Sequence, residues 1–97
     1  MVQFDVYEPR TGAFLLDAQS NWLLINTSRV VIPLLTAGSL PPTKHLTPAV
    51  STDGSAYIAV THQLFTVRAR GLGRPVANLA AYRGDINCAL DLLVTGF

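Results

Sequence analysis

The sequence predicts an α+β fold that is mostly β: a small, curled antiparallel sheet followed by one C-terminal helix, in a single domain over residues 1–97. Three observations support this. A chain of 97 residues has the size of one domain. Short segments with an apolar residue at every second position, typical of strands, follow one another up to about residue 70. From Leu79 onward the apolar residues are spaced as in a helix.

The first predicted element is a hairpin near the N-terminus. Within residues 3–7, Phe4 and Val6 fall on one face, as in a half-buried strand. Residues 8–12 contain a proline and a glycine, which favour a turn. Residues 14–18 then form the return strand.

A central strand and a second hairpin are predicted next. Residues 28–35 are rich in β-branched side chains and form the buried central strand, with Pro33 marking its end or a bulge. The hairpin is predicted where Asp-Gly at positions 53 and 54, a strong signal for a tight turn, separates residues 46–51 from residues 56–61.

The last predicted strand and the helix complete the fold. Residues 65–70 alternate again, which predicts that Arg68 and Arg70 point outward. The inward residues of this strand are Phe65, Val67 and Ala69. Asn78 is a candidate cap, and Gly96 stands where helices often end with a left-handed residue. The helix is predicted to bury one face, formed by Leu79, Tyr82, Ile86, Ala89, Leu90 and Leu93.

The composition predicts a self-associating protein. Hydrophobic residues make up 49% of the sequence and charged residues 13%, well below the usual share of about 25%. This excludes a disordered tail and leaves more apolar surface than so small a domain hides by itself. We therefore expect a homodimer. The candidate interface is the strip Trp22, Leu23, Leu24 and Ile25, because it interrupts the alternation; the alternative is that the strip belongs to the core.

Charge and sequence patterns predict a cytoplasmic protein with no membrane partner. The net charge of +1 gives no general attraction to nucleic acid or membranes. The longest uncharged apolar stretch, residues 30–35, is far shorter than the roughly 20 residues that span a bilayer. Cys88 is the single cysteine, so an internal disulfide is excluded, and residues 1–5 lack the pattern of a signal peptide.

The sequence has no pattern typical of a catalytic, metal or cofactor site. His45, His62 and Cys88 are spaced unlike known sets of metal ligands, so we expect ordinary histidines and a cysteine buried in the helix. No serine has the context of a catalytic nucleophile. The sequence therefore predicts a protein that is not an enzyme.

Four arginines stand out against this background. Arg68, Arg70, Arg74 and Arg83 lie within residues 64–84, which contain no Asp or Glu. Two interpretations are open. The arginines form a solvated strand face, or they bind an acidic segment of a partner or a phosphate backbone.

Several short strings, in order along the whole chain, resemble the CcdB family, the toxin half of plasmid-borne control-of-cell-death addiction modules. None is specific alone, but their order, spacing and total length together are. The strings are Gln3-Phe4-x-Val6-Tyr7, Asp17-x-Gln19-Ser20, Val31-Ile32-Pro33-Leu34, Leu46-x-Pro48-x-Val50, Val76-Ala77-x-Leu79, Asp85-Ile86, Ala89 and the closing Gly96.

The resemblance implies a cytoplasmic homodimer of the CcdB/Kid toxin type, with a partly open barrel, a short strand wing and a C-terminal helix. It implies binding to the A subunit of DNA gyrase, a type II topoisomerase, and trapping of the cleaved-DNA complex. It also implies a cognate antitoxin with a disordered, acidic C-terminal segment. Promoter DNA is then bound only through this antitoxin. The candidate antitoxin contacts are then Arg68, Arg70 and Arg74.

The resemblance further implies that the last three residues, Thr95, Gly96 and Phe97, enter the gap between two gyrase A subunits. The family pattern there is Trp-Gly-Ile, and its tryptophan stacks on an arginine of the target. Such cation–π stacking contributes about 0.5–2 kcal/mol, which Thr95 does not supply. Phe97 is expected either to contact the target or to pack on its own helix through Leu93.

Two other functions remain open at this point. One is a detoxified homologue that binds an antitoxin without poisoning gyrase. The other is a ribonuclease, because the same barrel scaffold carries messenger-RNA interferases. The only plausible set of acid, base and phosphate-binding groups is then His62, Asp53, Arg68 and Arg70, which nothing in their spacing selects.

Overall fold

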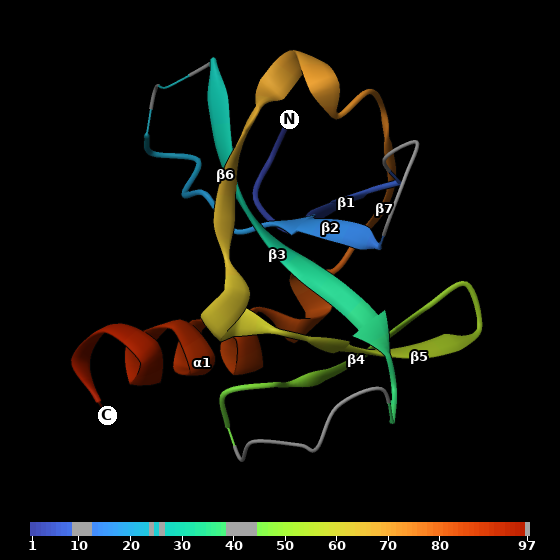
Figure 1. The fold of residues 1–97 in the computed structure, drawn as a ribbon, viewed down its shortest axis with the longest axis vertical. Helices are drawn as coiled ribbons and strands as arrows, with labels where there is room; N and C mark the ends of the chain where they lie inside the picture. The colour runs from blue at the N-terminus through green and yellow to red at the C-terminus, as the bar shows by residue number, and fades with distance from the viewer. Residues whose placement is uncertain (9–12, 24, 26, 39–44, 97) are drawn as a thin grey trace.

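The structure is a computed structural model that describes residues 1–8, 13–23, 25, 27–38 and 45–96 (Figure 1). Strands come first and the α-helix last, as predicted. The strands are β1 (Asp5–Tyr7), β2 (Phe14–Asp17), β3 (Ser28–Thr36), β4 (Ala49–Thr52), β5 (Ser55–Ala59), β6 (Phe65–Arg68) and β7 (Pro75–Asn78). The helices are three short 3-10 turns, η1 (Thr61–Gln63), η2 (Ala69–Gly71) and η3 (Ala80–Tyr82), and α1 (Arg83–Thr95).

The described strands form one antiparallel sheet that curls around β3. Its order is β4-β5-β3-β2-β1-β7, and β6 pairs with β3 in addition. One edge of β3 pairs with β2; along the other edge, residues 28–31 pair with β6 and residues 34–36 with β5. Because the two halves of this edge of β3 pair with different strands, the sheet bends into the half-barrel seen in Figure 1. The predicted fold class is confirmed.

Both predicted hairpins are present. β1 and β2 pair antiparallel, with Val6 opposite Leu16. Between β4 and β5, Asp53 and Gly54 have φ values of 52° and 75°. Two successive positive φ values are those of a type I′ turn, whose twist matches that of the flanking strands. The predicted turn at residues 8–12 lies outside the described residues.

The sheet is covered on both faces, so β1 is buried throughout rather than half-buried as predicted. On one face, Val6 packs with Leu16, Ile32 and the buried face of α1. On the other face, Tyr7 belongs to a second core cluster, whose members are Tyr7, Leu15, Val31 and Leu72. Leu72 follows η2, and this cover over the second face could not be read from the local alternation in β1.

Pro33 neither ends nor bulges the central strand, contrary to the prediction. β3 continues to Thr36, and its pairing with β2 keeps one register throughout. Proline has no N–H, and the N–H and C=O of one strand residue face the same edge. The Pro33 carbonyl accepts the Val60 N–H at 3.0 Å, where β3 changes partner from β6 to β5. The N–H that Pro33 lacks would therefore lie between the segments of β3 that pair with β6 and with β5, where no strand pairing is lost.

Two further predictions for this region were wrong or incomplete. Phe65 is 42% exposed rather than inward, whereas Ala69 is buried. Residues 69–71 form η2 instead of continuing the strand. β7 was not predicted, although it pairs with β1 and forms an edge of the sheet.

The C-terminal helix begins at Arg83, four residues later than the apolar pattern suggested. Asn78, the candidate cap, is not the N-cap of this helix, which is Tyr82; its Oδ1 instead accepts the N–H of Ala80, the first residue of η3, at 2.9 Å. Gly96 ends the helix with φ 81°, as predicted. Cys88 is exposed, which corrects the expectation of a buried helix cysteine. None of the described helices is long and apolar enough to cross a membrane.

Candidate functional site

The candidate interface strip lies on the connection between β2 and β3, and its described side chains are exposed. Trp22 is 93% exposed, Leu23 51% and Ile25 48%. These values exclude the alternative that these three residues belong to the core of the protomer. Leu24 lies outside the described residues. Exposed apolar side chains gathered on one segment are typical of a protein–protein contact surface.

The backbone of this connection is fixed by hydrogen bonds. The Trp22 N–H donates to Ser20 Oγ at 3.1 Å, and the Leu23 N–H donates to the Ser20 carbonyl at 3.1 Å. Asn21 Oδ1 accepts the N–H of Gln3 at 2.8 Å, which ties the N-terminal segment to the connection. The strip is therefore presented from an ordered turn.

Gln19 lies beneath the turn and is 4% exposed. Its Nε2 donates to the Ile25 carbonyl at 3.2 Å, and its Oε1 accepts the N–H of Val30 at 3.2 Å. One buried amide thus bridges the strip and the start of β3. No local sequence pattern marks Gln19 beyond the family string that contains it, because its partners lie 6 and 11 residues further along the chain.

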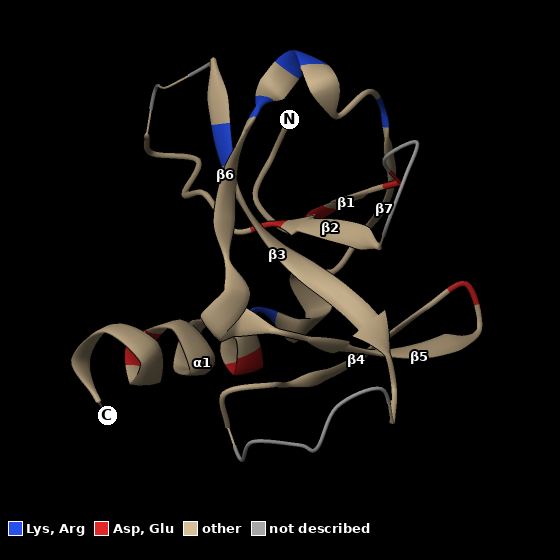
Figure 2. Cartoon of the chain, viewed as in Figure 1, with Lys and Arg blue, Asp and Glu red and all other residues tan. Residues whose placement is uncertain are grey.

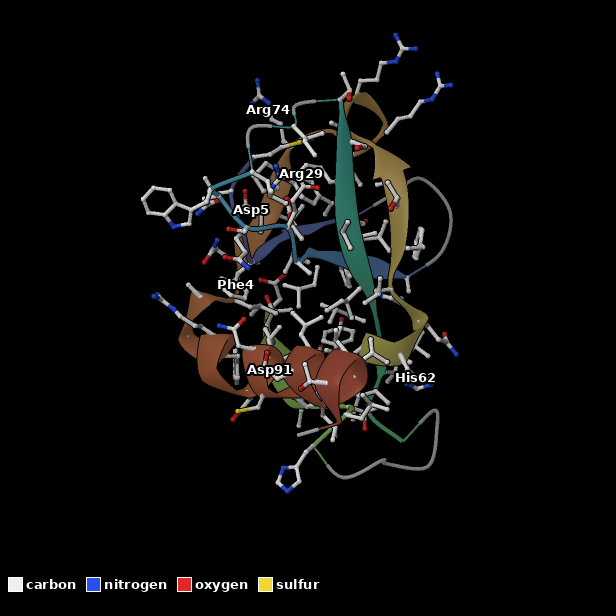
Figure 3. The ribbon with its side chains drawn as sticks, turned by 90° about the vertical axis from the view of Figure 1, so that its left-hand side faces the viewer. Phe4, Asp5, Arg29, His62, Arg74 and Asp91 are labelled. Carbon is white, nitrogen blue, oxygen red and sulfur yellow. The ribbon has the colours of Figure 1, made fainter. Side chains whose placement is uncertain are left out.

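A buried polar cluster continues below Gln19. Asp17 Oδ1 accepts the Gln19 N–H at 3.0 Å, and Asp17 Oδ2 accepts Arg29 Nε at 2.7 Å. Asp5 Oδ1 accepts Asn78 Nδ2 at 2.9 Å. Figure 3 shows Asp5 and Arg29 in the upper half of the molecule. Arg29 Nη2 is buried without a hydrogen-bond partner among the described residues.

Tyr7 adds a phenol to this cluster. Its hydroxyl lies 3.5 Å from Asp5 Oδ2. Burial, and then the negative charges of Asp5 and Asp17, raise the pKa of Tyr7 to about 12, against the opposing effect of Arg29. The phenol is therefore neutral at physiological pH and has no role as a base there. The cluster has the properties of a structural support.

The candidate antitoxin contacts share one end of the molecule. Arg68 ends β6, Arg70 lies in η2 and Arg74 precedes β7, and all three are exposed. Figure 2 shows the basic residues of β3, β6 and η2 gathered at this end. Because Arg29 is paired with Asp17, the positive charge available to a partner comes from the three exposed arginines. Their outward direction, predicted for Arg68 and Arg70, is confirmed.

The C-terminal candidates end α1. Thr95 Oγ1 donates to the Asp91 carbonyl at 2.6 Å, so this hydroxyl bonds its own helix. Val94 is 77% exposed, and Leu93 37%. Phe97 lies outside the described residues. The two roles expected for its side chain, contact with the target or packing on Leu93, therefore stay predictions.

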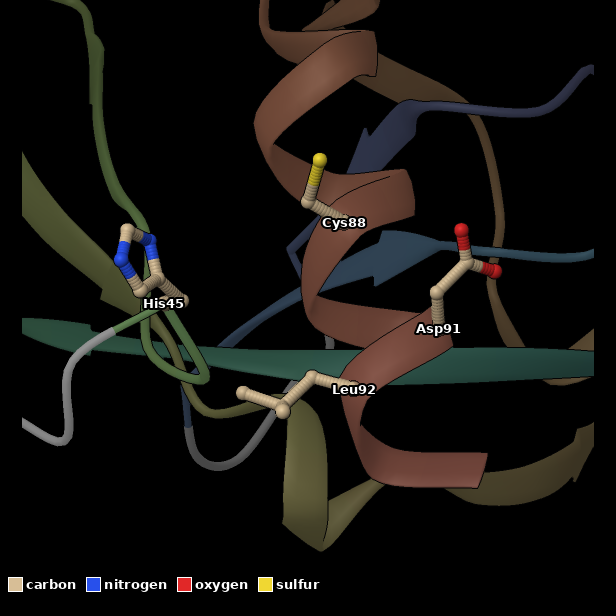
Figure 4. Close-up of a pocket in the computed structure, with 4 residues that line it drawn as sticks. All are labelled: His45, Cys88, Asp91 and Leu92. Carbon is tan, nitrogen blue, oxygen red and sulfur yellow. The ribbon is translucent and has the colours of Figure 1, made fainter. Parts of the chain in front are cut away.

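A pocket beside α1 brings together two residues that are distant in sequence. It has a volume of about 260 Å³ and is lined by His45, Cys88, Asp91 and Leu92 (Figure 4). Within the described part of the chain, no group of three or more His, Cys, Asp or Glu is arranged to hold a metal ion. A thiol and an imidazole thus line the same pocket, and among the described residues they are not part of a metal centre.

The residues considered for a ribonuclease site are not brought together. Asp53 lies in the β4–β5 turn and His62 in η1, while Arg68 and Arg70 belong to the basic end. Figure 2 shows the acidic β4–β5 turn well separated from that end. An acid, a base and phosphate-binding groups must meet at one substrate, and this set does not.

The comparisons with known proteins agree with the fold. The model of the CcdB protein family matches residues 3–96, nearly the whole chain. A search of curated proteins gives no match. The matched region includes every described strand, α1 and the connection that carries the interface strip. The chain belongs to the CcdB family.

Proposed function

We propose that this chain is the toxin of a type II toxin–antitoxin system. It acts without enzymatic activity, as a cytoplasmic homodimer that binds the A subunit of DNA gyrase and traps the cleaved-DNA complex. A cognate antitoxin neutralises it, and promoter DNA is contacted through that antitoxin. The observation that carries this proposal is the family match over residues 3–96.

The exposed strip supports the homodimer. Two further apolar residues are exposed besides Trp22, Leu23 and Ile25. They are Met1 and Val2, which are 50% and 49% exposed. The bond between Gln3 and Asn21 holds the N-terminal segment against the same connection. Burying such side chains contributes about 25 cal/mol per Å² of apolar surface removed from water. A second copy of the chain offers the same apolar surface in return.

The basic end supports the antitoxin contact. Its three arginines are exposed and have no carboxylate on the elements that carry them, β6, η2 and the segment before β7. Guanidinium groups bind carboxylates with charge-assisted, often bidentate hydrogen bonds. An acidic, disordered segment of the antitoxin would form these hydrogen bonds when it becomes ordered on the toxin. Electrostatic attraction between the arginines and its carboxylates would also increase the rate of association.

The C-terminus separates the leading proposal from its alternative. Gly96 keeps the left-handed conformation that lets the backbone turn after α1. Thr95 stands where the family pattern has tryptophan, and its hydroxyl is engaged with Asp91. This difference favours the second candidate function, a detoxified homologue that binds an antitoxin but does not poison gyrase.

Induction of the chain in a gyrase-sensitive bacterium tests the proposal. We expect growth arrest with induction of the DNA-damage response, and relief when the neighbouring antitoxin gene is co-expressed. Arrest accompanied by intact messenger RNA separates gyrase poisoning from RNA cleavage. Unimpaired growth with a folded, antitoxin-binding protein identifies the detoxified homologue. Light scattering that gives a mass near 10 kDa at every concentration refutes the homodimer.

A further inference from the structure

The segment that joins η2 to β7 has the backbone geometry of an anion-binding nest. Leu72 has φ −86° and ψ −26°, in the right-handed region, and Gly73 has a φ of 72°, in the left-handed region. A right-handed residue followed by a left-handed one turns successive N–H groups toward one point, and such concavities bind anions. The N–H groups that form this nest are those of Leu72, Gly73 and Arg74.

Two of the three N–H groups of the nest are available to a ligand. The Leu72 N–H donates to the Ala69 carbonyl at 3.1 Å and closes η2. Among the described residues, neither the Gly73 N–H nor the Arg74 N–H has a hydrogen-bond partner. Both residues are exposed, and a Cβ added at Gly73 would meet nothing within 4 Å. A group with acceptor atoms therefore has access to two unpaired donors.

Neighbouring residues hold the nest in place on both sides. The Leu72 side chain is buried and belongs to the core cluster that contains Tyr7 and Val31. On the other side, Arg74 precedes Pro75, and a residue before proline is restricted to extended conformations. Pro75 in turn pairs with Tyr7 of β1. Donors that are ordered in advance lose less entropy when a ligand binds.

The charged side chains beside the nest favour a negatively charged ligand. Arg70 and Arg74 are exposed, and neither forms an ion pair within the described part of the chain. Figure 3 shows the Arg74 side chain at the upper end of the molecule. Glu8 follows β1, the strand that pairs with β7, and this exposed carboxylate forms no ion pair with them either. Because backbone N–H and guanidinium groups only donate, the matching ligand is a carboxylate or phosphate oxygen.

We propose that residues 70–74 form an oxyanion site that holds a carboxylate of an acidic peptide. The N–H groups of Gly73 and Arg74 are the backbone donors, and the guanidinium groups of Arg70 and Arg74 are the charged donors. A peptide is favoured over duplex DNA, which is held through a run of roughly six to ten phosphate contacts in salt-sensitive complexes. Only the identification of this peptide with the antitoxin rests on the proposed function.

The decisive variant is Gly73→Ala, with Gly54→Ala as the matched control. Alanine causes no clash at either position but is strained at φ values of 72° and 75°. Gly54 lies in the β4–β5 turn, so both variants strain a turn and keep every arginine, but only Gly73→Ala turns the N–H groups of the nest. Gly73→Asn is the conservative variant, because asparagine tolerates the left-handed region.

Titration of the ¹⁵N-labelled full chain with a capped hexaglutamate peptide at constant ionic strength measures binding. The amide signals of Gly73 and Arg74 are expected to shift the most, and a capped hexaglutamine peptide is expected to shift neither. The dissociation constant is expected to rise at least about fivefold in Gly73→Ala and to change less than twofold in Gly54→Ala and Gly73→Asn. Arg74→Gln is expected to weaken binding as well, and Glu8→Gln to strengthen it.

Equal dissociation constants for Gly73→Ala and Gly54→Ala overturn the proposal, because the arginines alone then account for binding. Shifts caused by a DNA duplex but not by hexaglutamate overturn the acidic peptide as ligand. If Gly73→Ala does not fold, the shifts of the Gly73 and Arg74 amides in the unchanged chain decide, and their absence overturns the site. Hexaglutamate binding with the expected pattern, in a chain that binds no antitoxin, supports the site and refutes the proposed antitoxin contact.

Discussion

Asp17 and Arg29 form a 2.7 Å ion pair between β2 and β3, and both side chains are buried. The pair closes the base of the connection that carries the exposed strip, and Asp17 also accepts the backbone N–H of Gln19. It therefore links the core of the sheet to the surface proposed for self-association.

Removing one member of this pair is expected to be far more harmful than removing both. Asp17→Ala leaves a buried guanidinium without its counter-charge, and Arg29 Nη2 already has no hydrogen-bond partner among the described residues. We expect the free energy of unfolding to fall by about 3–5 kcal/mol. The double variant Asp17→Leu, Arg29→Met is expected to lose much less. Urea unfolding measures both, and equal losses would contradict this account.

The buried phenol predicts a loss of stability in alkaline solution. In the folded chain the pKa of Tyr7 is raised to about 12, against roughly 10 for an unfolded tyrosine. Below pH 10 both states keep the proton, so stability is unaffected by Tyr7. Between pH 10 and 12 the unfolded state loses its proton first, and stability falls as the pH rises. Tyr7→Phe is expected to show a shallower fall in urea unfolding over this range, and an identical slope would refute it.

The basic end is expected to bind the acidic antitoxin segment in a salt-dependent manner. Reversing Arg68 and Arg70 to Glu replaces attraction with repulsion and is expected to weaken binding without unfolding the chain. For a matched single change, Arg70→Glu is compared with Arg83→Glu, since Arg83 is also exposed but begins α1. Calorimetric titration with the antitoxin encoded by the neighbouring reading frame measures the affinities. Equal affinities for the two single variants would show that these arginines are only a solvated face.

Replacing glycine by alanine is expected to have opposite effects on stability at Gly84, inside α1, and at Gly96, which ends it. An added Cβ would meet nothing within 4 Å at either Gly84 or Gly96, so neither change causes a clash. Gly96 has a φ of 81°, where alanine is strained, and Gly96→Ala is expected to destabilise by about 1 kcal/mol. Gly84 lies in the first turn of α1 without a positive φ, and Gly84→Ala is expected to stabilise by about 0.5–1 kcal/mol. Thermal unfolding that shifts in the same direction for both would contradict the assigned conformations.

Local signals in the sequence were sufficient for the elements that depend on few neighbours. Asp53 and Gly54 define their turn by their own backbone preferences, and Gly96 ends α1 for the same reason. The central position of β3 follows from its length and apolar content. These features need no knowledge of what packs against them.

Features that depend on distant contacts could not be predicted in this way. The outer cover of the sheet comes from η2 and Leu72, so the full burial of β1 did not follow from alternation. β7 is four residues long and begins with proline, and its strand geometry depends on pairing with β1. The role of Gln19 appears only when Ile25 and Val30 are brought to it.

A substitution at the C-terminus is expected to raise the affinity of this chain for gyrase. Thr95→Trp restores the family's aromatic residue directly before Gly96. If the docking mode of the family applies, the added indole is expected to raise gyrase affinity by about 0.5–2 kcal/mol, which corresponds to roughly 2- to 30-fold. Thr95→Val is the control, because it also removes the hydroxyl bonded to Asp91 but adds no aromatic ring. Surface-bound gyrase A subunit provides the binding measurement, and equal affinities would exclude the shared docking mode.

The central claim is tested most directly by the cleavage of supercoiled plasmid DNA by purified gyrase in the presence of this protein. After denaturation of the enzyme, we predict linear DNA whose amount rises with the concentration of the chain. Deleting Gly96 and Phe97 is expected to abolish this product while the melting temperature stays nearly unchanged. No linear DNA with the folded chain, and none with Thr95→Trp, would contradict the account and leave a CcdB-family protein that does not poison gyrase.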